Sequence, residues 1–331
     1  MNREYIGHPD QCMTVQQGVL TGGKQQGVRF VNISNGSGLD LIVLPDRCMD
    51  LYQVRFKNKN CGFIYPCGIV HPSYFIRSDE GWIDTFAAGF LTTCGLSYTG
   101  IGADDDGIKT SLHGVIGNMP AVHMNIEREI ADNVQIVRLS GEIHEHLSGA
   151  NITLKRDITV SHKTNEIAIH DQVQNSGFKR TPHMIIYHCN LGYPLLSESA
   201  VIEVNSGAIR GRTRWAQENV GKWREIPGPQ NEFEEMCFYH EIIPDADGLA
   251  SAALKNPREH IGVEIRYNPC TLDNFVQWSM FKKGEYVLGL EPCNATIDGR
   301  DDARRNNTLK YLDPGENVTH NLVFRFFEVK V

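Results

Sequence analysis

The chain has no long apolar run, no paired-cysteine motif and little positive charge, and each of these absences excludes a class of protein. No apolar stretch approaches the roughly 18–20 residues that cross a bilayer, and the first fifteen residues contain no apolar core of a signal peptide. The nine cysteines are scattered from Cys12 to Cys293 without a CxxC pair, which argues against a disulfide framework or a structural zinc site. We therefore expect a cytoplasmic protein with no membrane partner.

The charge balance and the missing glycine-rich motifs exclude further classes. With 32 Lys and Arg against 40 Asp and Glu, the net charge is −8, so the chain lacks the positive field of a nucleic-acid-binding protein. It contains neither a GxGxxG after a predicted strand nor a P-loop, and we expect no cofactor. A length of 331 residues with 41% hydrophobic residues is nevertheless enough for a large buried core. These properties favour an enzyme or a small-ligand binder.

Alternation of apolar and polar residues, which is typical of half-buried strands, is the main pattern that is present. It recurs over residues 122–126, 134–136, 152–160, 167–173, 261–267 and 322–326. Turn residues such as Ala131-Asp132-Asn133 separate successive runs, which predicts an antiparallel meander with one solvated face. Short helices are predicted only within 79–90, with Ser78 or Asp79 as N-cap, and within 250–254, and residues 222–235 are predicted to form a surface loop. The chain is therefore interpreted as one all-β domain over residues 1–331.

Three segments carry side chains that a plain β-sandwich does not need. His113 lies between Leu112 and Gly114 in an irregular loop, and loop residues on a rigid scaffold are disproportionately functional. His188 lies at the end of a predicted strand in which Ile185 and Tyr187 point to one face and Ile186 and His188 to the other. An imidazole with a pKa of about 6.5 can give or take a proton at neutral pH. Glu291 ends an apolar strand, where desolvation should raise its pKa toward the range of a general base.

Each of these residues also has a purely structural interpretation. His113 could cap a turn, His188 could be an ordinary hydrogen-bonded residue at a strand end, and Glu291 could pair with an arginine. Arg47, in a Pro-Asp-Arg turn, could hold two vicinal hydroxyls in a forked hydrogen bond or form an ordinary ion pair. Trp278 could stack on the apolar face of a sugar or pack in the core. Taken one at a time, the residues leave these alternatives open.

Taken together, the motifs resemble those of a known family. LHG at 112–114, HCNLG at 188–192 and LEP at 290–292, in this order along a β-rich chain, resemble the aldose 1-epimerase (galactose mutarotase-like) family. The likeness is greatest to a divergent branch, a domain of uncharacterised function, which shares DRxMD at 46–50 and GFxxTCGL at 89–96. It extends over nearly the whole chain. The resemblance implies a large antiparallel β-supersandwich.

The resemblance also implies roles for individual residues. His188 matches the histidine that protonates the ring oxygen of the sugar, and Glu291 matches the glutamate that accepts the proton of the anomeric hydroxyl. His113 matches a histidine that binds on the ring-oxygen side, and Arg47 matches an arginine that binds hydroxyls. Asn190, two residues after His188, is expected to contact the substrate as well.

The chain departs from the family pattern at two points. Only Cys189 separates the histidine from the asparagine, where the family has an aromatic residue and Phe, and the sugar-binding Asp of the family has no clean counterpart. The nearest candidates are His240 and Glu241. Gln277 and Trp278, in a predicted strand, are two further candidates for contact with a sugar. These departures leave the identity of the sugar open.

The function that the resemblance implies is mutarotation, the interconversion of the α and β anomers of a free aldose by acid and base catalysis. The alternative is a non-catalytic carbohydrate-binding protein of the same fold. A glycoside hydrolase would need two opposed carboxylates, and the sequence identifies Glu291 alone. A metal-dependent sugar isomerase could use His144 and His146, which share a strand face. We expect a sugar as the ligand, no metal, and either a monomer or a homodimer.

Overall fold

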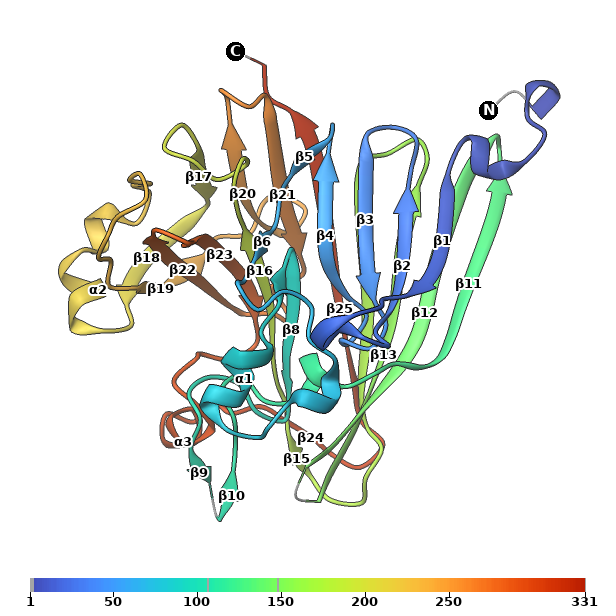
Figure 1. Cartoon of the computed structure of the whole chain (residues 1–331). Coiled ribbons are helices and arrows are strands. Elements are labelled where there is room, and N and C mark those ends of the chain that lie inside the picture. Colours follow the sequence, from blue (N-terminus) through green and yellow to red (C-terminus); the bar gives the residue numbers. More distant parts are fainter. Residues whose placement is uncertain (1–2, 106, 148, 331) are drawn as a thin grey trace.

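The computed structural model describes residues 3–105, 107–147 and 149–330 and is built mainly of antiparallel strands (Figure 1). Strands account for 50% of the chain and helices for 11%, which confirms the all-β prediction. Three sheets of eight, six and five strands contain most of the strands. Within the described ranges, no helix is long and apolar enough to cross a membrane.

The largest sheet contains the predicted meander. Its strands lie in the order β11 (Val122–Ala131), β12 (Val134–Leu147), β13 (Ala150–Ser161), β14 (Glu166–Asn175), β25 (Asn317–Glu328), β21 (Ile261–Tyr267), β20 (Ala250–Asn256) and β17 (Val201–Val204). Ile158 on β13 lies opposite Ile169 on β14, which in turn lies opposite Leu322 on β25. Rows of apolar side chains thus cross the sheet on one face, as the period-2 pattern predicts.

The prediction of a helix within 250–254 is wrong, because these residues belong to β20. The strand pairs with β17 on one side and β21 on the other, so its backbone groups are satisfied in both directions. Ala252 and Leu254 are buried in the core, and the small helix preference of alanine is outweighed by this pairing and burial. The other predicted helix is confirmed as α1 (Asp79–Thr85), and the Ser78 side chain accepts a hydrogen bond from the amide of Gly81 as its N-cap.

The five-stranded sheet packs across the meander and closes the main core. Its strands lie in the order β1 (Thr14–Val19), β2 (Arg29–Ser34), β3 (Leu39–Leu44), β4 (Asp50–Phe56) and β5 (Lys59–Asn60). Ile33 and Leu41 from this sheet and Leu139 and Leu154 from the meander belong to one buried apolar cluster. The blue sheet therefore faces the green strands in Figure 1 as a second layer.

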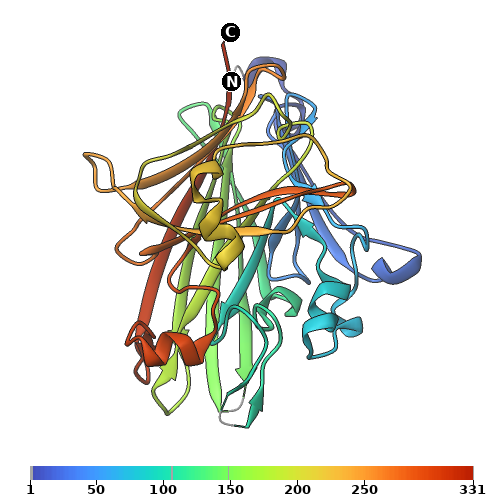
Figure 2. The same ribbon diagram turned by 90° about the vertical axis from the view of Figure 1, so that its left-hand side faces the viewer.

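The six-stranded sheet positions the site. Its strands lie in the order β18 (Ser206–Gly211), β19 (Met236–Ile242), β22 (Asn274–Lys282), β23 (Glu285–Cys293), β16 (Met184–Leu191) and β8 (Leu91–Leu96). Figure 2 shows its orange strands running across the steep strands of the largest sheet. Ile185 and Tyr187 point into the main core, whereas Ile186 belongs to a separate apolar cluster on the outer face. This division confirms the predicted alternation along β16.

Short elements surround the outer face of the six-stranded sheet. They are the strands β6 (Phe63–Ile64), β7 (Ala88–Gly89), β9 (Asp104–Asp105), β10 (Ile108–Lys109), β15 (Thr181–Pro182) and β24 (Tyr311–Leu312), and the helices α1, α2 (Arg214–Glu218) and α3 (Arg300–Arg305). Trp82 of α1 and Phe86 at its C-terminal end pack in the same outer cluster as Ile186. The helix α1 therefore forms one wall of a hollow over the sheet.

Candidate active site

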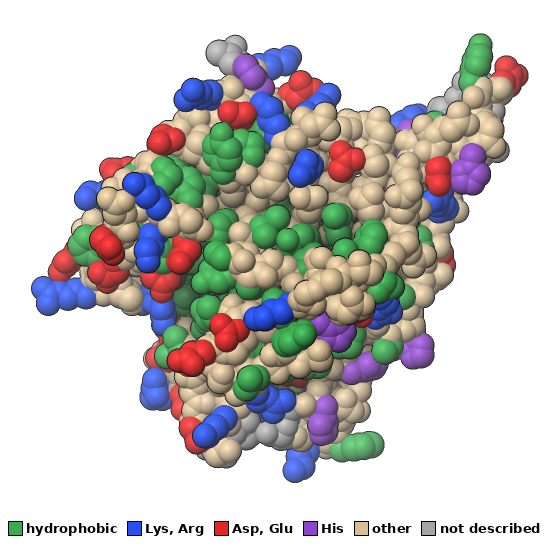
Figure 3. Space-filling model, in the orientation of Figure 1, with side chains coloured by type: hydrophobic (Ala, Val, Ile, Leu, Met, Phe, Trp, Pro, Cys, Tyr) green, Lys and Arg blue, Asp and Glu red, His purple; other side chains and the backbone are tan. Residues whose placement is uncertain are grey.

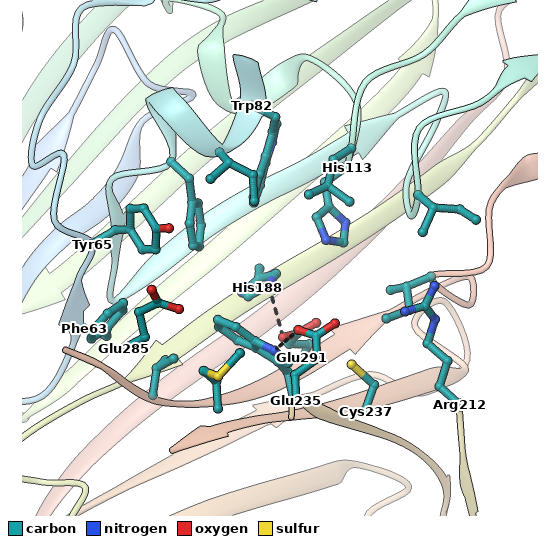
Figure 4. A pocket seen from close by; sticks show the side chains of 18 residues that line it. Phe63, Tyr65, Trp82, His113, His188, Arg212, Glu235, Cys237, Glu285 and Glu291 are labelled. Atoms are coloured by element: carbon teal, nitrogen blue, oxygen red, sulfur yellow. Dashed lines mark hydrogen bonds and ion pairs between the residues drawn. The ribbon is translucent and has the colours of Figure 1, made fainter. Parts of the chain in front are cut away.

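A pocket with a cavity volume of about 250 Å³ lies on the outer face of the six-stranded sheet. Hydrophobic side chains gather in the middle of the face that Figure 3 presents, with acidic side chains beside them. The pocket is lined by Phe63, Tyr65, Trp82, Ile83, Phe86, Ile101, Leu112, His113, His188, Arg212, Glu235, Cys237, Trp278, Met280, Glu285, Val287, Glu291 and Ile297 (Figure 4). A mostly apolar lining with a few convergent polar groups is typical of a small-molecule site.

His188 and Glu291 meet at the floor of this pocket. They lie on the neighbouring strands β16 and β23, where Cys189 pairs with Leu290, and both side chains project from the outer face. His188 Nε2 lies 3.3 Å from Glu291 Oε1, and the two residues are only 6% and 1% exposed. A Cβ on Gly289 would lie 2.2 Å from Glu291 Oε1, so the glycine leaves the space that the carboxyl group occupies.

Burial shifts both members of this pair toward their uncharged forms. Desolvation lowers the pKa of His188 to about 4, against the smaller opposing effect of the neighbouring Asn190 side chain. Desolvation, and then the negative charge of Glu235, raises the pKa of Glu291 well above its usual value. The predicted direction for Glu291 is therefore confirmed. Both shifts favour a pair that shares one proton and in which neither group carries its charge.

His113 approaches His188 from the loop that follows β10. Its backbone adopts a left-handed conformation with φ of 55°, and its amide donates a hydrogen bond to the carbonyl of Gly100. The imidazole contacts two neighbouring rings. Its ring centroid lies 5.0 Å from that of Trp82 and 5.6 Å from that of His188. Burial, and then the charges of His188 and Arg212, hold the pKa of His113 well below its usual value. Its buried Nδ1 has no hydrogen-bond partner in the described structure, so its hydrogen-bonding capacity is unused.

Aromatic rings form the walls of the pocket around this pair. Trp82 and Phe86 stack with ring centroids 4.4 Å apart, and the Phe86 ring lies 5.7 Å from that of His188. The Trp278 ring lies 5.4 Å from that of His188, and its indole N–H donates a 2.9 Å hydrogen bond to Glu235. An aromatic face can stack on the C–H face of a sugar ring.

A hydrogen-bonded cluster closes one end of the pocket. Arg212 Nε donates a 2.9 Å hydrogen bond to Asp298 Oδ1, and the Tyr239 hydroxyl donates a 2.6 Å hydrogen bond to Asp298 Oδ2. The Arg212 guanidinium is thus held in position at the edge of the cavity (Figure 4). Its other N–H groups can reach a substrate hydroxyl.

The structure brings four of the predicted site residues into the pocket: His113, His188, Trp278 and Glu291. Arg47 is not among them. Its side chain is buried elsewhere and donates hydrogen bonds to the carbonyl oxygens of Gly117, Val70 and Thr85, so it connects loops rather than binding hydroxyls.

The other three predicted substrate-binding residues, Asn190, His240 and Gln277, also lie outside the pocket lining. Asn190 is buried beside His188 and donates a hydrogen bond to its carbonyl oxygen, so it supports the strand instead of meeting a ligand. His240 Nδ1 lies 2.8 Å from Ser206 Oγ, and Gln277 donates a hydrogen bond to the carbonyl of Trp223. Both point to the inner face of the sheet.

Glu241, the other candidate for the missing sugar-binding Asp, also lies outside the pocket lining, on β19. Its carboxylate accepts a hydrogen bond from the amide of Ala208 on the neighbouring strand β18.

Several pocket residues were not predicted from the sequence. Trp82 and Phe86 are four residues apart in the predicted helical segment, and this spacing could have shown that they share a face. Glu235 ends the predicted surface loop, and Glu285 begins β23 after a hairpin turn. Arg212, which follows β18, carries no sequence signal of its own.

The metal-dependent alternative finds no support in the arrangement of side chains. His144 and His146 are exposed on β12 and do not line the pocket. His144 contacts Thr153 and Glu142. Across residues 3–105, 107–147 and 149–330, no group of three or more His, Cys, Asp or Glu side chains is arranged to hold a metal ion.

The fold and this pocket define a galactose mutarotase-like protein, as the sequence motifs imply. A family described as a domain of unknown function (DUF4432) matches residues 25–326, and the chain belongs to this family. No curated protein matches the chain.

Solved structures extend the comparison. A Klebsiella pneumoniae protein provisionally described as an aldose 1-epimerase has a TM-score of 0.90 and 26% identity, covering 96% of this chain and 84% of that one. A galactose mutarotase-like protein from Clostridium acetobutylicum has a TM-score of 0.67 and 11% identity, covering 96% and 100%. Galactose 1-epimerase from Lactobacillus acidophilus has a TM-score of 0.61 and 11% identity, covering 96% and 99%. The last two likenesses concern the fold alone.

Proposed function

We propose that the protein is an aldose 1-epimerase, an isomerase that interconverts the α and β anomers of a free aldose. The observation that carries the proposal is the 3.3 Å approach of His188 Nε2 and Glu291 Oε1 at the floor of a sugar-sized pocket. The buried Nδ1 atoms of His113 and His188, which have no partner in the described structure, support it, because they provide free hydrogen-bonding capacity. The description of the Klebsiella pneumoniae protein points to the same reaction.

Mutarotation needs one proton removed and one delivered. Glu291 accepts the proton of the anomeric hydroxyl while His188 protonates the ring oxygen, and the ring opens to the aldehyde. Rotation about the bond between C1 and C2 exposes the other face of the carbonyl, and ring closure reverses the two transfers. Each positioned acid or base contributes a factor of roughly 10²–10⁴ to the rate.

The single proton of the pair is sufficient for this cycle. Its movement from Glu291 Oε1 to His188 Nε2 converts the uncharged pair into a carboxylate base and an imidazolium acid. The two oxygens that exchange protons with the enzyme are bonded to the same sugar carbon, so a base and an acid this close together can reach both. The rings of Trp278 and Phe86, both in contact with that of His188, would pack against the sugar.

The proposal is tested by following anomer exchange directly. The purified protein is mixed with freshly dissolved single anomers of a panel of aldoses, and optical rotation or one-dimensional NMR records the approach to equilibrium. We expect acceleration above the buffer rate that is proportional to protein concentration. Saturable sugar binding without acceleration would instead support the non-catalytic carbohydrate-binding alternative, and acceleration of no aldose would refute the proposal.

The pH dependence of exchange should reflect the buried pair. As the pH falls, His188 gains the second proton, and the pair then contains two acids and no base. Because burial lowers the pKa of His188 to about 4, the catalysed rate should stay level from neutral pH down to about pH 5 and fall only near pH 4. The measurement is kcat/KM against pH after subtraction of the buffer-catalysed rate. A decline centred at the ordinary histidine pKa of about 6.5 would contradict this assignment.

A further inference from the structure

Two buried polar atoms next to the catalytic pair, His188 Nδ1 and Asn190 Oδ1, take no direct part in proton transfer. Both residues are buried, and among the residues that the structure describes neither atom has a hydrogen-bond partner. The first is a ring nitrogen that can carry a proton, and the second is an amide oxygen that can accept a hydrogen bond. Buried polar atoms are rarely left unpaired, so two complementary ones on neighbouring side chains require a physical reason.

The two side chains stand next to each other on one face of β16. Residues two apart in a strand project from the same face, so Asn190 lies on the face that carries His188. On the neighbouring strand β23 the residue paired with Asn190 is Gly289, which has no side chain to compete for the amide. Asn190 Nδ2 donates a 3.0 Å hydrogen bond to the His188 carbonyl oxygen, and this bond holds the amide group beside the histidine.

The effect of Asn190 on the charge of His188 identifies the atom that faces the ring. Burial lowers the pKa of His188 to about 4, whereas the Asn190 side chain, and then the carbonyl oxygen of His188 itself, act in the opposite direction. A hydrogen-bond acceptor favours the imidazolium, and a donor would favour the neutral ring. The Asn190 atom that meets the ring is therefore its oxygen, Oδ1.

The tautomer of His188 decides whether the ring can receive a proton from Glu291. His188 Nε2 lies 3.3 Å from Glu291 Oε1, so Nε2 has to be the nitrogen without a proton. The single proton of the neutral ring is then on Nδ1. An oxygen beside Nδ1 favours this tautomer, because in the other one a nitrogen lone pair would face the lone pairs of the amide oxygen.

We propose that Asn190 is a positioning residue whose Oδ1 accepts a hydrogen bond from His188 Nδ1. This bond keeps the proton of the neutral ring on Nδ1 and stabilises the imidazolium that forms when Nε2 takes the proton of Glu291. The Nδ1 proton stays in place throughout the cycle, so the number of protons in the pair is unchanged. The inference rests on the proposed function, and it gives Asn190 no contact with the substrate, because Asn190 does not line the pocket.

The first test reads the tautomer directly and needs no sugar. The protein is labelled with ¹⁵N-histidine, and NMR at pH 7 correlates the ring nitrogens with the ring C–H protons. The signals of His188 are those missing from His188→Asn. We expect a protonated Nδ1 and an unprotonated Nε2 in the native protein, and a reduced share of this tautomer in Asn190→Leu, which keeps the size of the side chain and removes its oxygen.

The second test separates positioning from a purely structural role. Asn190→Leu should lower kcat for anomer exchange about tenfold to a hundredfold, the effect of losing a hydrogen bond to a charged group, and should leave KM within about twofold. Asn190→Asp keeps an oxygen in the same place and should restore both the tautomer and most of kcat.

The structural control is Asn294, a buried asparagine that accepts a 2.7 Å hydrogen bond from the amide of Ile185 on the same strand. Asn294→Leu should lower the midpoint of thermal unfolding, because it removes a hydrogen bond to the backbone of β16. It should leave the tautomer of His188 unchanged and keep kcat within a factor of about three, since Asn294 does not line the pocket.

The outcomes distinguish this inference from the proposed function. A native His188 with its proton on Nε2 overturns the inference, even if Asn190→Leu does not fold. A loss of kcat in Asn190→Leu without a change of tautomer also overturns it, since the role would then be structural. If the native protein accelerates no aldose, the proposed function fails, whatever tautomer the spectrum shows.

Discussion

Replacing Glu291 by Gln should lower catalysed anomer exchange by a factor of about 10³ or more and leave the protein folded. The amide cannot accept the proton of the anomeric hydroxyl, and it cannot pass a proton to His188 Nε2 across the 3.3 Å that separates the pair. Folding should tolerate the change, because burial favours the uncharged form of this carboxyl and the amide has almost the same shape. The measurements are the exchange rate by NMR and the midpoint of thermal unfolding.

The matched comparison uses two buried histidines of the same sheet. His188→Asn should lose activity as Glu291→Gln does, since it removes the acid. His240 is equally buried and its pKa is also lowered to about 4 by burial, but its side chain lies on the opposite face of the sheet. His240→Asn should therefore keep the rate of anomer exchange within a factor of about three of the native rate, because His240 does not line the pocket. Glu291→Gln retaining more than a tenth of the native rate would contradict the assigned role.

Local alternation made much of the fold predictable. The period-2 runs between 122 and 175 became β11 to β14, since each run buries one face and turn residues separate it from the next. The same rule placed Tyr187 and His188 on opposite faces of β16. The order of the strands in the sheets depends on pairings far apart in sequence, such as β14 with β25, and no local pattern contains that information.

Alternation also explains one incorrect expectation about the site. Gln277 and Trp278 are adjacent on β22 and cannot both point into one pocket, so at most one could contact a sugar. The side chain of Trp278 faces the pocket, and that of Gln277 bonds to Trp223 on the other side. Applied at the sequence level, the rule would have excluded one member of the pair, although it could not have said which.

The position of Arg47 could not be anticipated in this way. The sequence of the turn that carries Arg47 is typical of an exposed turn. The Arg47 guanidinium is nevertheless buried and donates to three carbonyl oxygens from segments 23 to 70 residues away. Glu235 and Glu285 show the opposite outcome. Both lie in segments whose sequence is typical of the surface, yet both line the pocket. Which loop end meets which strand is decided by the assembled sheets.

A buried ionic network beneath the catalytic strand leads to the second large expected effect. Arg156 on β13 is fully buried, and it donates hydrogen bonds of 2.9 and 2.6 Å to Asp171 and of 2.9 Å to Asp50. The Tyr187 hydroxyl also donates to Asp171, at 2.7 Å, and Tyr187 directly precedes His188 in β16. Burial raises the pKa of Asp50 to about 6 even against the attraction of Arg156.

Arg156→Met should therefore lower the free energy of unfolding by about 3–5 kcal/mol, because it leaves two buried carboxylates without their cation. Urea unfolding at pH 8 measures the loss, and Arg325→Met, which removes an exposed arginine 4.0 Å from Glu166, should change stability by no more than about 0.5 kcal/mol. The loss should shrink at pH 5. Without the attraction of Arg156 the pKa of the buried Asp50 carboxyl rises further above that of the unfolded chain, the folded variant binds more protons, and its stability falls more steeply as the pH increases. A loss that is equal at both pH values would point to packing alone and contradict the electrostatic role.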